Sequence, residues 1–234
     1  MFMKKRAMSC IALLLAAVLV LGLSACGSTN SDVHGTVENA ESTVQPTETV
    51  AEEADGDFDI GTSNGSVYKN EFLGITAEFG SEWHLYSDEE CKKLNEQVLG
   101  TLSDDYAQQM KNADYFYDMM ATIEETGCSV NVVLQNMGLQ AAFANITESL
   151  KQGCEGLKTS YESTGYTDVS YEIIKTQFLG EEREGTKIVS KINGVDFYTK
   201  QVFYMKGKYA VSVTVCALGT DDCDSMLGMF TALK

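Results

Sequence analysis

The sequence predicts an α+β fold in which an antiparallel sheet of about six or more strands is flanked by helices. Three observations carry this prediction. Residues 139–161 place apolar side chains at three- and four-residue steps, which is the period of an amphipathic helix. Residues 169–217 divide into four alternating segments separated by short turns, as in a β-meander. Asn193-Gly194, between two of these segments, is a strong hairpin signal.

The first elements are a hairpin and a capped helix. Residues 67–69 and 73–79 read as two short strands joined near Asn70. Ser87 and Glu90 have the spacing of a capping box, which starts a helix that Gly100 would end. A weaker helical piece follows over residues 103–111.

The middle of the chain predicts a second hairpin and the longest helix. Residues 115–124 and 128–135 alternate as strands around a turn at Thr126-Gly127. Within 115–120, the run of tyrosine, phenylalanine and methionine fits core packing, with a binding surface as the alternative. The helix over 139–161 would place Phe143 and Leu150 on its buried face and end at Gly165.

The predicted meander strands are 169–179, 186–192, 195–205 and 208–217. Residues 209–216 are small or apolar on both faces, which indicates a central strand covered on both sides. Thr220 would cap a final helix over residues 221–233. Asp221, Asp222 and Asp224 suit the positive end of that helix, and calcium binding is the alternative interpretation.

This order of elements, with Tyr68, Asn70, Gly74 and Ile75 in the opening hairpin and Trp83 at the strand exit, resembles the PsbP-like and Mog-like superfamily. The resemblance spans nearly all of residues 67–234 and implies an α/β/α sandwich. Many bacterial members of that superfamily are lipoproteins, and its known members bind protein partners rather than catalyse reactions. No functional residue is carried over from the resemblance.

Residues 1–25 have the parts of a secretory signal, with basic residues at 4–6 and an apolar run over about 11–23. Leu23-Ser24-Ala25-Cys26 then resembles the lipobox of bacterial lipoproteins. It implies cleavage between Ala25 and Cys26 and a diacylglycerol on the Cys26 thiol, which anchors the chain on the extracytoplasmic face of the cell membrane. An uncleaved membrane helix is the alternative, but the run is shorter than the roughly 20 residues that a span requires.

Residues 26–66 are predicted to be the lipidated cysteine and a disordered acidic tether. Residues 27–66 contain nine acidic residues, no Lys or Arg, and few bulky apolar side chains. Asp55, Asp57 and Asp59 match the start of a calcium loop, but Ile60 and Ser66 occupy positions that require glycine and glutamate. We therefore expect a solvated linker before a single domain over 67–234.

The formal net charge is −17, and removal of the three basic residues in the signal lowers it to −20. This charge excludes nucleic-acid binding as a function class, because the protein would repel phosphate backbones. After cleavage and lipidation, five cysteines remain, an odd number without C-x-x-C spacing: Cys91, Cys128, Cys154, Cys216 and Cys223. We expect small buried side chains, with one incidental disulfide as the alternative.

The sequence contains no recognisable catalytic, phosphate-binding or metal-binding motif, and we predict no cofactor. Of its two histidines, His34 lies in the tether, and His84 at a strand end is a weak candidate for a catalytic base. The predicted function is a non-enzymatic binding or assembly module for a protein or envelope partner. A hydrolase or redox enzyme with a dispersed site, and a small-solute-binding lipoprotein, remain alternatives.

Overall fold

The computed structural model describes residues 58–101, 115–138, 141 and 144–233. Its helices are α2 (Asp88–Thr101), α4 (Ile146–Ser163) and α5 (Cys223–Leu227). Its strands are β1 (Thr62–Asn64), β2 (Val67–Asn70), β3 (Ile75–Glu78), β4 (His84–Leu85), β5 (Tyr115–Ile123), β6 (Cys128–Asn136), β7 (Thr167–Phe178), β8 (Glu181–Ile192), β9 (Val195–Lys206), β10 (Tyr209–Leu218) and β11 (Phe230–Ala232). No helix of these described ranges is long and apolar enough to cross a bilayer.

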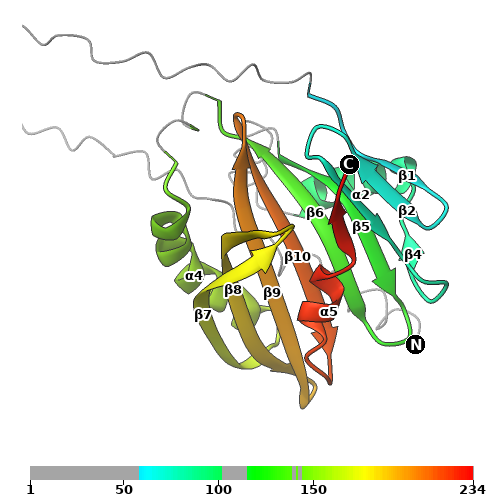
Figure 1. Cartoon of the computed structure of the whole chain (residues 1–234). Coiled ribbons are helices and arrows are strands. Elements are labelled where there is room, and N and C mark those ends of the chain that lie inside the picture. The colour runs from blue at the N-terminus through cyan, green and yellow to red at the C-terminus, as the bar shows by residue number, and fades with distance from the viewer. Residues whose placement is uncertain (1–57, 102–114, 139–140, 142–143, 234) are drawn as a thin grey trace, which may run out of the picture.

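The described strands form two antiparallel sheets. The larger has seven strands in the order β4-β5-β6-β10-β9-β8-β7, and the smaller has four in the order β1-β2-β3-β11. The smaller sheet and α5 cover one face of the larger sheet, while α2 and α4 lie on its other face (Figure 1). The predicted α+β sandwich is confirmed, with one outer layer built mainly from strands.

Strand β10 is central, as its sequence predicts. It lies between β6 and β9, and its side chains alternate between two hydrophobic cores. Val211, Val213 and Val215 are buried in the core between the sheets, whereas Ala210 and Cys216 are buried beneath α4. Small and apolar residues on both faces are needed because neither face reaches water.

The meander follows the predicted turns closely. Val195 pairs with Ile192, so Asn193 and Gly194 form a two-residue loop. Their φ values of 53° and 80° are those of a type I′ turn, whose twist matches that of the flanking strands. The turn signal in the sequence therefore fixes the register of β8 and β9.

Helix α4 begins later than predicted. It starts at Ile146, because the Asn145 side chain accepts a hydrogen bond from the Glu148 backbone N at 3.1 Å and caps the first turn. The predicted start at residue 139 is wrong, and Phe143 lies outside the described residues. The buried face of α4 is confirmed from Leu150 to Tyr161, and the Tyr161 hydroxyl lies 3.0 Å from Thr199 Oγ1 on β9.

The Ser87–Glu90 capping box is confirmed at the start of α2. The Ser87 backbone N donates to Glu90 Oε2 at 2.9 Å, and the Glu90 backbone N donates to Ser87 Oγ at 3.4 Å. The described part of the helix extends to Thr101, past the predicted stop at Gly100. The weaker helix predicted over residues 103–111 lies outside the described residues.

The C-terminus differs from the prediction of a helix over 221–233. Asp222 rather than Thr220 occupies the N-cap position of α5, without a capping hydrogen bond from its side chain, and the helix ends after five residues. The chain then forms β11, which pairs with β3. Phe230 explains the switch, because the strand buries its ring between the sheets, 5.7 Å from that of Phe178.

The ordered fold also begins earlier than residue 67, within the range predicted as tether. Strand β1 pairs with β2, and the Phe58 ring stacks on Tyr209 with a centroid separation of 4.3 Å. The edge-to-face contact of Phe58 with Phe72 completes this aromatic cluster. The polar composition of residues 61–66 gives no strand signal in the sequence, because the stability of β1 comes from pairing with β2 rather than from its own side chains.

Candidate functional site: a groove beside the buried Asp118 carboxylate

A groove of about 430 Å³ lies between α2, the start of β5 and the segment at residues 60–61. Apolar side chains line it from three directions: Ile60 from the N-terminal segment, Cys91 from α2, and Phe116 from β5. The volume is within the range of small-ligand pockets in proteins, about 300–1,000 Å³. The site is therefore large enough to take a small molecule or a few side chains of a partner.

Asp118 lines this groove and is only 7% exposed. It occupies a bulge in β5, where the register with β6 shifts between Tyr117 and Met119. The bulge accommodates one residue more than the opposite strand. Tyr117 is therefore buried against α2 and Met119 in the core between the sheets, with Asp118 as the extra residue between them.

Three neutral donors hold the Asp118 carboxylate. The Gly61 backbone N donates to Oδ1 at 2.8 Å, and the Tyr68 hydroxyl and Asn70 Nδ2 donate to Oδ2 at 2.5 and 2.8 Å. Burial raises the pKa of Asp118, and these hydrogen bonds oppose the rise. Burial also raises the pKa of Tyr68 well above its usual value, so Tyr68 retains its proton and acts as the donor.

Gly61 is required where the N-terminal segment crosses this network. A Cβ atom at residue 61 would lie 2.4 Å from the Tyr68 ring and 2.6 Å from Asp118 Oδ2. Both distances are far below van der Waals contact. Only glycine therefore lets the backbone approach the carboxylate closely enough to donate its N–H.

Helix α2 forms another wall of the groove, and Asn95 attaches this helix to β5. The Asn95 side chain accepts from the Tyr117 backbone N at 2.7 Å and donates to the Tyr117 carbonyl at 3.2 Å. The Asn95 side chain thus bonds both backbone polar groups of Tyr117, as a neighbouring strand would. Asp88, in the first turn of α2, accepts from the Ser63 backbone N at 3.1 Å and connects the helix to β1.

The charges around the groove are predominantly negative. Of the described residues that line it, Asp88, Glu89 and Asp118 are acidic and Lys92 is basic. Among the residues that the structure describes, none of these four side chains forms an ion pair. The proximity of Asp88 contributes to the raised pKa of Asp118, so the two carboxylates repel each other.

The groove contains one thiol, which is not an activated nucleophile. Burial raises the pKa of Cys91 to about 12, and the nearby carboxylates add to this effect. The reactive form of cysteine is the thiolate, which is scarce at neutral pH when the pKa is this high. The thiol therefore acts as a small apolar part of the wall.

The structure places His84 away from this groove. It is an exposed residue of β4, and its Nε2 lies 3.1 Å from Glu90 Oε1 on the surface. His34 lies outside the described residues, as do Ala25, Cys26, Asp55 and Asp57. Asp59 is exposed at the beginning of the described chain.

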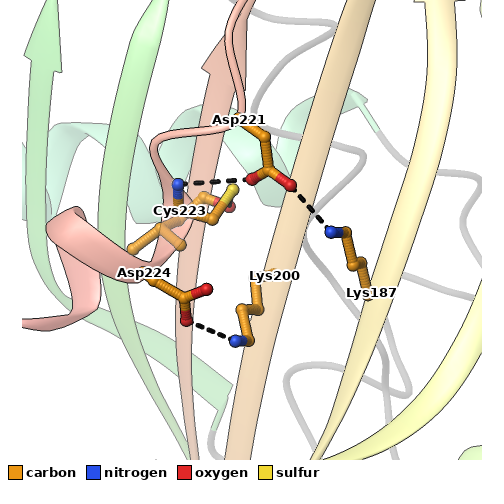
Figure 2. Close-up of polar contacts among 6 residues, drawn as sticks. Lys187, Lys200, Asp221, Cys223 and Asp224 are labelled. Carbon is orange, nitrogen blue, oxygen red and sulfur yellow. Dashed lines mark hydrogen bonds and ion pairs between the residues drawn. The ribbon is translucent and has the colours of Figure 1, made fainter.

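The C-terminal aspartates are engaged with lysines from the large sheet. Asp221 accepts from Lys187 Nζ at 2.7 Å and Asp224 from Lys200 Nζ at 2.5 Å (Figure 2). The hydrogen bond to Asp221 raises the pKa of Lys187. Across the described ranges, no group of three or more possible metal ligands is found. These carboxylates attach α5 to β8 and β9.

The five remaining cysteines are free thiols in the described structure. Four of them are buried, as the sequence predicts, and Cys128 is half-buried. Burial raises the pKa of Cys216 to about 11. These side chains pack as small apolar groups in the cores.

The run at residues 115–120 serves in packing and also contributes to the groove. Tyr117, Met119 and Met120 are buried, which confirms core packing for these three. Phe116, Tyr117 and Asp118 also line the groove. The sequence does not reveal Gly61, Asp88 and Asn95 as its other members, because they come from separate elements. The signal of the groove that the sequence does offer is Asp118, an acidic residue within an apolar strand.

Comparison with known proteins gives likenesses in structure alone. No family model matches the chain, and a search of curated proteins finds no match. LpqN of Mycobacterium tuberculosis, described as involved in cell envelope biogenesis, is similar at 12% identity and a TM-score of 0.35, over 66% of this chain and 75% of that one. Cyanobacterial PsbP from Synechocystis is similar at 12% identity and a TM-score of 0.40, over 76% and 95%. We derive neither a family nor a function from these values.

Proposed function

We propose that the protein is a membrane-tethered extracytoplasmic lipoprotein whose folded domain binds a protein or envelope partner without catalysing a reaction. The observation that carries the proposal is the order of segments along the chain. Residues 1–25 have the pattern of a secretory signal that ends at Leu23-Ser24-Ala25-Cys26, an acidic stretch follows, and the described strands of the sandwich begin at Thr62. A diacylglycerol on Cys26 would supply two acyl chains, which suffice for stable anchoring.

The groove supports the binding part of the proposal. Ile60 and Gly61 form part of its wall, so it lies where the chain enters the fold from the N-terminal side. Its chemistry suits contact better than catalysis. The Asp118 carboxylate is occupied by three donors, and the Cys91 thiol stays protonated at neutral pH.

The anchoring part is tested by Cys26→Ala in cells that express the full chain. Metabolic labelling with a fatty acid should mark the wild-type protein only. The wild type should sediment with membranes, and the variant should be released or accumulate unprocessed. Label that persists in Cys26→Ala would refute the lipoprotein assignment.

The binding part is tested by crosslinking on intact cells with a reagent that does not cross the membrane. The wild type should form discrete adducts on the outer surface, and purified folded domain added in excess should compete for the partner and reduce them. If the purified domain does not reduce the adducts while Cys26 is still labelled, the lipoprotein assignment stands. The proposal that the folded domain binds the partner would then be refuted.

A further inference from the structure

We propose that the groove between α2, β5 and residues 60–61 binds a lysine or arginine side chain, with apolar neighbours, from a segment of the partner protein. The inference rests on the proposed function, because it names the chemistry of the partner that the domain would bind.

The charge around the groove is complementary to a cation. Asp88 and Glu89 line the groove from the first turn of α2, and the buried Asp118 lines it from β5. Among the described residues that line the groove, Lys92 is the one basic residue, and it forms no ion pair with another described residue. A partner cation would be attracted to Asp88 and Glu89, because neither forms an ion pair with a described residue.

The walls suit the stem of a long basic side chain. Lys and Arg bury their methylene chains along apolar surface and keep the charged group near polar atoms. Ile60, Phe116 and Cys91 offer such a surface in the same groove as Asp88 and Glu89. An aromatic ring also attracts a cation to its face, so Phe116 in the groove wall favours an ammonium or guanidinium over a neutral group.

Two other occupants fit the charge less well. The chain's own residues 27–57 contain no Lys or Arg, so the tether cannot supply the cation. A second copy would bring another strongly acidic molecule to an acidic site, since the formal charge of the full sequence is already −17. A partner protein that presents a basic residue is therefore the favoured occupant.

The experiment titrates the mature chain, residues 26–234, with blocked pentapeptides and measures dissociation constants by calorimetry. The probes are Gly-Leu-Lys-Leu-Gly, its Arg counterpart and its Gln counterpart. The Lys and Arg peptides should bind about tenfold or more tightly than the Gln peptide, and raising the salt from about 20 to about 200 mM should weaken only the charged peptides.

Paired variants locate the binding. The double change Asp88→Asn and Glu89→Gln retains the side-chain shapes and should weaken Lys-peptide binding roughly five- to thirtyfold. Lys92→Glu should strengthen it. The matched control, Glu124→Gln with Glu125→Gln, removes two exposed acids from the β5–β6 turn and should leave binding unchanged.

Equal weakening in the groove and control variants would overturn the proposal, because binding would then follow net charge alone. Equal affinity for the Lys and Gln peptides would also overturn it. Binding of a peptide that spans residues 27–57 would mean that the tether occupies the groove. Self-association that the groove variants abolish would mean that a second copy occupies it. Either result would overturn the assignment to a partner protein. If crosslinking still captures a partner while these results fail, the binding function stands and only the groove assignment falls.

Discussion

Asp118 is a buried carboxylate held by neutral donors, and it joins three parts of the chain. Its oxygens accept from Gly61, from Tyr68 and Asn70 on β2, and so bring the N-terminal segment and the small sheet to β5. Loss of one partner would leave buried polar groups without a bond, which costs about 1–3 kcal/mol for each group. The residue therefore links the two sheets as well as shaping the groove.

The raised pKa of Asp118 predicts a pH dependence of stability. In the unfolded chain this carboxyl titrates near its ordinary pKa of about 3.9. Burial raises the pKa in the folded state, so the folded state binds more protons between the two values. The contribution of Asp118 to the free energy of unfolding is therefore greatest at low pH and falls as the pH rises through that window.

Asp118→Asn removes this titration and isolates its effect. Urea unfolding of both proteins from about pH 3 to pH 7 should show the stability of the wild type, relative to the variant, declining as the pH rises. A difference that grows with pH would mean that the folded state lowers the pKa of Asp118, and our description of its environment would be wrong.

Gly61→Ala tests the close approach of the backbone to this network. The added Cβ would overlap the Tyr68 ring and Asp118 Oδ2, so residues 58–64 must shift and the Gly61 hydrogen bond must break. We expect a loss of about 2–4 kcal/mol in the free energy of unfolding. Gly156→Ala is the control, because its Cβ would meet no atom within 4 Å, and it should be neutral or stabilising.

At the scale of elements, α4 gives the clearest test of packing. Leu150 is fully buried beneath the large sheet, whereas Lys151 is exposed on the next position of the helix. Leu150→Ala should lower the free energy of unfolding by about 2–5 kcal/mol through the cavity it leaves. Lys151→Ala should change it by no more than about 0.5 kcal/mol. Equal effects in denaturant melts would contradict the assigned buried face.

The elements whose signal is local could be predicted from the sequence. The Ser87–Glu90 box starts α2, and Asn193-Gly194 fixes the turn between β8 and β9. The elements that depend on distant partners could not. Strand β1 exists because β2 offers an edge, and β11 forms because Phe230 is buried beside Phe178. Nothing within residues 61–64 or 228–232 alone encodes those contacts.

The groove was beyond sequence reasoning for the same reason. Its walls come from residues 60–61, α2 and β5, which are separated by tens of residues in the chain. Asp118 is visible in the sequence as an acid within an apolar strand, but its bulge and its donors appear only in three dimensions. Gly61 cannot be distinguished from the other glycines of an acidic linker by sequence alone.

At the scale of the whole molecule, the acidic charge and the predicted anchor act together. An acidic domain is repelled by an anionic membrane surface, so a lipid at Cys26 would hold it near the bilayer while the charge keeps it in solution. The groove is lined by Ile60 and Gly61, near the start of the described chain. A partner bound there would be held near the membrane.

The most direct test of the central claim is site-specific photocrosslinking in intact cells that express the full-length protein. A photoreactive residue replaces Lys92 at the groove or, as the control, Lys158 on α4. The account predicts a discrete adduct with an extracytoplasmic or envelope protein from position 92 only, and loss of that adduct when Cys26→Ala releases the protein. Equal adducts from both positions, or no adduct from position 92, would contradict it.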